Sequence, residues 1–119
     1  MRMWIAMGLA AALAACAGLR VEPSGARGEA AQGRRFVERA CAGCHSIEAK
    51  GPSPDPLAPP FRTLWARFPG PALDRRLADL ALHGRRNMPP IYMTPDERRA
   101  ASAYVRELGR LAARTGRRA

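Results

Sequence analysis

The chain has 119 residues and a formal net charge of +10, from 20 basic and 10 acidic side chains. This length predicts a single domain, and the prevalence of Ala, Leu and Arg with only 6% aromatic residues favours helices over strands. The charge indicates anionic partners. Because the chain has no nucleic-acid-binding signature and begins like an exported protein, we expect acidic proteins or anionic lipid head groups and no nucleic acid.

The first segment resembles an export signal. Met1 and Arg2 form a short positive start, and residues 3–19 follow without a charged side chain, which fits the apolar region of a signal peptide over residues 1–15. The run LAAC that ends at Cys16 resembles a bacterial lipobox, in which the cysteine becomes the lipidated first residue. Ordinary cleavage and retention as an uncleaved anchor are the alternatives.

The segment that follows has the composition of a linker. Residues 16–29 include Pro23, several glycines and scattered charges, which is typical of a lipidated or flexible tether. The folded domain is expected over residues 30–112, with a basic tail over residues 113–119. This organisation predicts a protein on the periplasmic side of a bacterial membrane, either lipid-anchored or soluble.

Residues 41–45, CAGCH, form the motif with the most specific chemistry, because C-x-x-C-H is the attachment signature of c-type haem. The thiols of Cys41 and Cys44 are spaced to add to two vinyl groups on one porphyrin edge, and His45 is then the proximal iron ligand. A redox dithiol or half of a zinc site shares the C-x-x-C spacing. A zinc site needs further ligands, but His83 is the only other histidine and there is no second cysteine pair. A redox dithiol of the thioredoxin type needs a βαβ context, which the sequence lacks. The motif therefore predicts one covalently attached haem c.

Met88, in the run RNMPP, is the expected sixth ligand of the iron. A thioether is a soft ligand, and a His/Met pair raises the reduction potential. Pro89 and Pro90 would stiffen the loop that presents the sulfur. Met93 and His83 are alternative ligands, and Met88 as an ordinary buried side chain is also open.

These motifs resemble the class I monohaem cytochromes c of the small bacterial periplasmic type, over roughly residues 29–111. The resemblance implies an all-α, cytochrome c-like fold of about four short helices around one covalently bound haem. Members of that family cross a first helix, with a glycine and an aromatic residue, over their last helix. Gly33, Phe36 and Val37 match this pattern.

Hydrophobic periodicity places three further helices. The last helix is expected to start with a capping box in the run TPDE at residues 94–97. A third helix is expected over about residues 71–82 and is ended by Gly84. The buried residues expected in these two helices are Leu73, Leu77, Leu80, Ala81, Ala101, Tyr104, Val105, Leu108 and Leu111. A short helix with an aromatic face toward the haem is expected from Phe61, Leu64, Trp65 and Phe68.

The proline-rich residues 51–60 predict an ordered loop, because prolines disfavour both helix and sheet. The family resemblance implies that a loop carbonyl accepts a hydrogen bond from the proximal imidazole, and we assign the Pro59 carbonyl by position. Phe61 and Trp65 are expected near the haem, and Trp65 could serve core packing or donate to a haem propionate.

The resulting function is that of a single-electron carrier and not an enzyme. It would exchange electrons with acidic redox partners such as a dehydrogenase or a terminal oxidase. Arg62, Arg67, Arg85 and Arg86 are candidates for a steering ring, or else for an ordinary solvated basic face. Two other functions stay open, namely a permanent haem-binding subunit of a larger dehydrogenase or oxidase complex and a gas- or peroxide-reactive haem protein.

Overall fold

The structure is a computed structural model, and it describes residues 24–118. Over that range the elements are α1 (Ser24–Ala40), a 3-10 turn η1 (Phe61–Thr63), α2 (Leu64–Arg67), α3 (Pro71–His83) and α4 (Pro95–Gly116). The fold is therefore all-α, as the sequence predicts. Within the described residues, no helix has both the length and the apolar character needed to cross a membrane.

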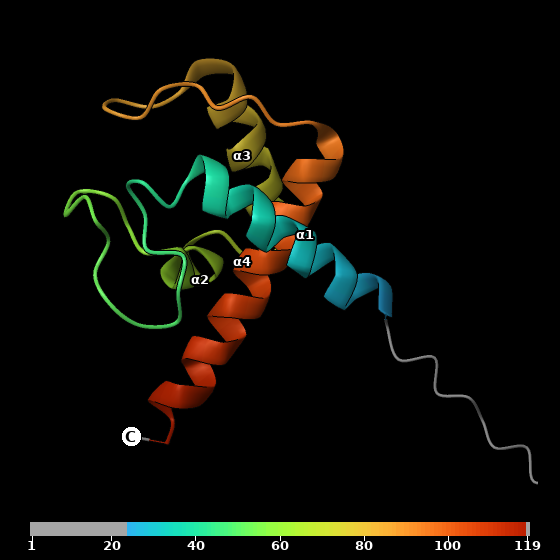
Figure 1. Ribbon diagram of the computed structural model, residues 1–119, viewed down its shortest axis with the longest axis vertical. Helices are drawn as coiled ribbons and strands as arrows, with labels where there is room; N and C mark the ends of the chain where they lie inside the picture. The colour runs from blue at the N-terminus through green and yellow to red at the C-terminus, as the bar shows by residue number, and fades with distance from the viewer. Residues whose placement is uncertain (1–23, 119) are drawn as a thin grey trace, which may run out of the picture.

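Helices α1 and α4 cross at the centre of the molecule (Figure 1). Gly33 makes the crossing possible, because a methyl group at this position would lie only 1.9 Å from the carbonyl oxygen of Ala100. Next to it, Val37 and Val105 are each 1% exposed in the shared core. The expected pairing of the first and last helices is confirmed, but Leu111 is 44% exposed, so the buried stripe of α4 ends at Leu108.

Helix α4 begins with the predicted capping box. The Thr94 hydroxyl accepts from the Glu97 backbone N–H at 3.1 Å, and the Glu97 carboxylate accepts from the Thr94 N–H at 2.9 Å. This exchange satisfies two amides that have no partner in the first turn of a helix. Helix α3 is tied to α4 by Asp74 and Arg98, whose side chains are 2.8 Å apart.

Both outer helices are longer than the sequence indicates. Helix α1 begins at Ser24, so it includes the last residues of the segment that we expected to be a tether. Ala30 is 4% exposed, and its burial favours a helix here despite the nearby glycines. Helix α4 continues to Gly116 and takes in part of the expected tail, because Ala, Leu and Arg all favour helix. The expected signal peptide, Cys16 and the start of the tether lie outside the described residues.

The loop between α1 and η1 is ordered by hydrogen bonds, as its prolines predict. The Phe61 N–H donates to the Ser46 carbonyl at 2.9 Å, and the Asp55 N–H donates to the Cys44 carbonyl at 3.0 Å. The buried hydroxyl of Tyr104, on α4, donates to the Ile47 carbonyl at 2.6 Å. The last helix thus holds the segment that directly follows the CAGCH motif.

Candidate haem site

The CAGCH motif continues the end of α1 as a tight turn. The Cys41 N–H donates to the Val37 carbonyl at 2.9 Å, and the His45 N–H donates to the Cys41 carbonyl at 2.9 Å. One turn therefore carries both cysteines and the histidine. Cys41 is half-buried and Cys44 is exposed, and the two form no disulfide with each other. Burial raises the pKa of Cys41 to about 11, so an unmodified thiol there stays neutral at physiological pH.

His45 is oriented by the loop that follows it. Its Nδ1 lies 2.8 Å from the Pro59 carbonyl oxygen, the acceptor expected from the sequence. Since a carbonyl can only accept, Nδ1 carries the proton and the lone pair is on Nε2. The Phe61 ring, which is buried, lies with its centroid 5.1 Å from that of the imidazole. The imidazole is thus fixed in the tautomer that a metal ligand needs.

Met88 is held by a tight turn after α3. Arg85 and Met88 exchange two backbone hydrogen bonds, of 2.7 Å and 2.5 Å. The turn requires positive φ at Gly84 (63°) and at Arg86 (38°). Gly84 is buried, and a methyl group on it would lie 2.6 Å from the Met88 carbonyl oxygen. The Met88 side chain is partly buried against the core.

The alternative sixth ligands lie in different surroundings. Met93 is 7% exposed within the core, as expected for a packing residue. The side chain of His83 is 70% exposed, and its Nδ1 lies 3.2 Å from a carboxylate oxygen of Asp79. At the end of α3, the Gly84 N–H donates to the Leu80 carbonyl.

The residues of the predicted aromatic face lie in different surroundings. Phe61 contacts His45, whereas Trp65 packs on α4 at Gly109, where an added methyl would lie 2.8 Å from the Trp65 Cβ. Phe68 lies under the guanidinium of Arg76, 5.6 Å from its ring centroid. Trp65 and Phe68 are both partly buried against the core, and the expected aromatic face toward the haem stays a prediction.

A set of apolar side chains packs against the core, yet each of them is only partly buried. They come from α1, α2, α3 and the segments between the helices. They are Ala40, Cys41, Ala42, Ala49, Leu64, Trp65, Phe68, Leu77, Ala81, Met88 and Ile91. Half-covered apolar surface of this extent fits a prosthetic group that completes the core. Together with the cysteine pair and the oriented imidazole, these residues fit a covalently bound haem.

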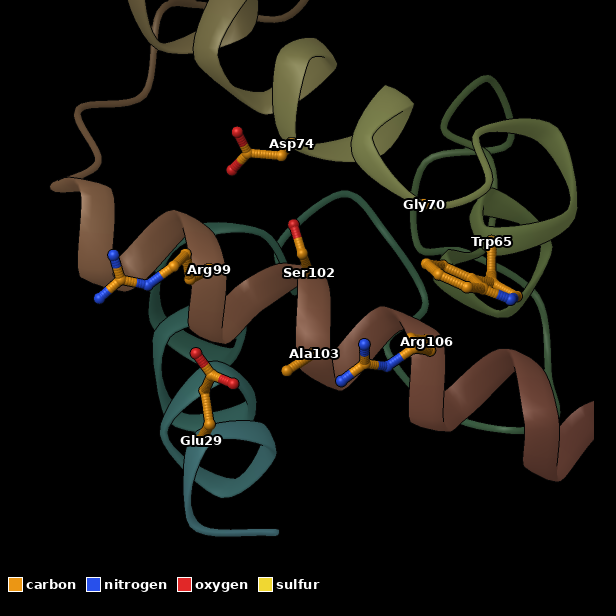
Figure 2. Close-up of a pocket in the computed structure, with 8 residues that line it drawn as sticks. All are labelled: Glu29, Trp65, Gly70, Asp74, Arg99, Ser102, Ala103 and Arg106. Atoms are coloured by element: carbon orange, nitrogen blue, oxygen red, sulfur yellow. The ribbon is translucent and has the colours of Figure 1, made fainter. Parts of the chain in front are cut away.

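Other sites in the described part of the chain are less suited to chemistry. No three His, Cys, Asp or Glu side chains gather there as a metal cluster. A hollow of about 250 Å³ lies between α4, Trp65 and the start of α3 (Figure 2). A second one, of about 350 Å³, lies between α1 and the distal part of α4. Neither is lined by Cys44, His45 or Met88.

Sequence reasoning missed two contributions to this site. Gly84 was interpreted only as the end of a helix, and its contact with the Met88 backbone is a tertiary one. Tyr104 was interpreted only as a core residue, although its hydroxyl holds the loop after His45. One signal in the sequence could have indicated the role of Gly84, namely a glycine just before the turn that ends at Met88 and Pro89.

The helical fold and the CAGCH turn with its oriented histidine define a c-type cytochrome domain. Residues 28–105, which are 78 of the 119 residues, match the model of the family described as cytochrome c oxidase, cbb3-type, subunit III. The chain belongs to this family and therefore carries covalently bound haem c with its iron. No curated protein and no solved structure gave a match.

Proposed function

We propose that this protein is a single-electron carrier in which Cys41 and Cys44 hold the haem and His45 and Met88 are its axial ligands. Haem c, when bound, supplies a one-electron couple between ferrous and ferric iron. The proposal includes no catalytic residue. Its main support is the 2.8 Å hydrogen bond between His45 Nδ1 and the Pro59 carbonyl, which leaves the unprotonated Nε2 available as a ligand.

The role of His45 follows from that bond. A histidine that donates Nδ1–H to a carbonyl is a better electron donor through Nε2, and it cannot rotate freely. A ligand held in this way stays in place when the charge on the iron changes. Little rearrangement then accompanies electron transfer, which is what a carrier needs.

The role of Met88 is supported by the turn that carries it. Two backbone hydrogen bonds with Arg85 and the packing of Gly84 against the backbone fix the Met88 residue. Pro89 and Pro90 add two residues with restricted φ directly after it. A ligand presented by a rigid turn keeps a sixth position closed, which favours electron transfer over gas or peroxide chemistry.

The partner surface is proposed to include the two loops beside these ligands. Leu57 and Tyr92 are each 81% exposed, one in each loop, and Arg85 and Arg86 are exposed beside Met88. Exposed apolar side chains with arginines around them suit a transient docking site for an acidic redox protein. Rising salt should slow the reaction with such a partner, and a rate that does not depend on salt would contradict steering.

A second candidate function is that of a subunit in an oxidase complex. The family match to a cbb3-type subunit III favours it, as do the exposed Leu57, Leu82 and Tyr92. A permanent subunit would co-purify with the larger complex in mild detergent and would remain bound at high salt. A carrier that docks through charge would dissociate.

The cellular location that we propose is the periplasmic side of a bacterial membrane, with a signal peptide over residues 1–15 and a lipid on Cys16. The lipobox-like run before Cys16 supports this assignment. Labelling with a radioactive fatty acid tests it. Loss of label in Cys16→Ser is expected, and label that persists in that variant would contradict lipidation.

Haem attachment through the two cysteines can be tested on the matured protein. Its mass should exceed that of the polypeptide by one haem, and the haem should stay with the chain after acid denaturation. Single Cys41→Ser and Cys44→Ser variants should retain one thioether or none. Variants that keep the full attachment of the unmodified protein would overturn the assignment.

A further inference from the structure

The distal half of α4 carries a face of arginines that the proposed electron transfer does not use. From residue 106 to residue 118 the chain has five arginines and a single acidic residue, Glu107. We call Arg106, Arg110, Arg114, Arg117 and Arg118 the α4 arginine face. At 3.6 residues per turn, the three of them that are helical lie within about 80° of one another around the axis.

This face is directed away from the core. The buried residues of α4 in this region, Tyr104, Val105 and Leu108, occupy the opposite side of the helix. Beyond Leu111, only Ala112 is partly buried, and the other residues described are exposed. Figure 1 shows the carboxyl end of α4 projecting below the other helices.

The positive charge of the face is not neutralised by neighbours in the described part of the chain. None of its five arginines forms an ion pair there. Nearer the start of α4, Arg99 is paired with Asp96 at 2.5 Å. Arg99 and Arg106 also line the 250 Å³ hollow together with Glu29 and Asp74 (Figure 2). Unbalanced positive charge is therefore concentrated in the distal part of the helix.

We propose that the α4 arginine face binds the surface of an anionic phospholipid bilayer. The face is a stripe about 16 Å long, and its arginines beyond Arg106 line neither of the two hollows, so that stretch lacks the buried centre of a protein interface. The surface of an anionic lipid bilayer attracts each basic residue that lies near it, and this attraction does not require a pocket in the protein. Leu111, 44% exposed beside the stripe, is placed to enter the head-group layer.

The position of the face fits this role. In Figure 1 the carboxyl end of α4 lies at the bottom of the view, and the loop of residues 84–94 lies at the top. A membrane that binds the distal end of α4 therefore leaves the loop that carries Met88 open to redox partners. The inference does not depend on a lipid at Cys16.

The test compares the matured holoprotein on two kinds of vesicle, phosphatidylcholine alone and phosphatidylcholine with phosphatidylglycerol. The ratio of the two partition coefficients removes any contribution of an acyl chain or other apolar anchor, which binds both. The test variant replaces Arg110, Arg114 and Arg117 with Gln. The matched control replaces Arg35, Arg67 and Arg75 with Gln, which lowers the net charge equally on exposed residues of α1, α2 and α3.

The expected result is a preference for anionic vesicles that falls by about a hundredfold in the α4 variant and by much less in the control. An unchanged visible spectrum would show that the variant is folded. Equal losses in both variants would mean that only net charge matters, and they would overturn the proposal. So would a wild-type protein without preference, or an α4 variant that slows the reaction with an acidic redox protein but binds vesicles normally.

Discussion

Gly84 lies directly against the backbone of Met88, so close that a methyl group on Gly84 would approach the Met88 carbonyl oxygen to 2.6 Å. The same methyl would lie 2.7 Å from the Pro90 nitrogen. Gly84 also has a φ of 63°, which L-residues with a side chain rarely adopt. The position of the proposed sulfur ligand therefore depends on a residue that has no side chain.

Gly84→Ala should displace the Met88 turn. We expect loss of the weak red band of Met–iron ligation in the ferric spectrum and destabilisation by about 2 kcal/mol or more, from the left-handed φ and the clash together. Gly70→Ala is the matched control, since its φ is 57° but its added methyl meets nothing within 4 Å. The control should cost stability without changing the spectrum. Equal spectra for the two variants would contradict the positioning role.

Gly33→Ala should weaken the crossing of α1 and α4. An added methyl would lie 1.9 Å from the Ala100 carbonyl oxygen, so the helices must separate, at a cost of about 3 kcal/mol. Gly28→Ala in the same helix meets nothing within 4 Å and should be neutral or slightly stabilising. Thermal unfolding of the matured proteins measures both. A loss in Gly33→Ala no larger than in Gly28→Ala would show that the crossing is looser than described.

The capping box of α4 should make stability depend on pH. Hydrogen bonds from the backbone N–H and then the hydroxyl of Thr94 hold the pKa of Glu97 below its ordinary value of 4.5. Because the pKa of Glu97 is lower in the folded protein, its ionised form stabilises the fold at pH values above its ordinary pKa. This contribution is lost as the pH falls through the pKa of the folded state. The difference in Tm between the wild type and Glu97→Gln should therefore be largest at neutral pH and should close in acid. A difference for Glu97→Gln that stays the same from neutral pH to acid would contradict this prediction.

Tyr104→Phe should loosen the segment after the CAGCH motif. The change removes the hydroxyl that donates to the Ile47 carbonyl at 2.6 Å and leaves a buried acceptor without its partner, at a cost of about 1–3 kcal/mol. Tyr92→Phe is the control, because Tyr92 is 81% exposed, and its effect should stay within about 0.5 kcal/mol. Denaturant unfolding measures both, and equal effects would mean that the hydroxyl contributes nothing to the loop.

Local signals in the sequence predicted the parts of the fold that depend on neighbouring residues. The capping box at Thr94 needs only four residues in order, and the turn from Cys41 to His45 only five. The crossing at Gly33 came from the family resemblance, and a small residue on an apolar helical face is in keeping with it. The bond from His45 to Pro59 came from the family resemblance rather than from a pattern in the residues.

The features that the sequence did not predict depend on tertiary contacts. The early start of α1 is favoured by the burial of Ala30, which no local pattern reveals. The spacing of Phe61, Trp65 and Phe68 suggested one aromatic face, but α2 is a single turn (Leu64–Arg67). Helical periodicity cannot fix the direction of side chains that lie partly outside so short a helix.

The most direct test of the account is the visible spectrum of the matured protein in both redox states, with carbon monoxide added to the reduced form. We predict a weak red band in the ferric protein that is lost in Met88→Ala but kept in Met93→Leu, and no carbon monoxide adduct in the wild type. A wild-type protein that binds carbon monoxide readily, or a band that survives in Met88→Ala, would contradict His45/Met88 ligation and the electron-carrier function that depends on it.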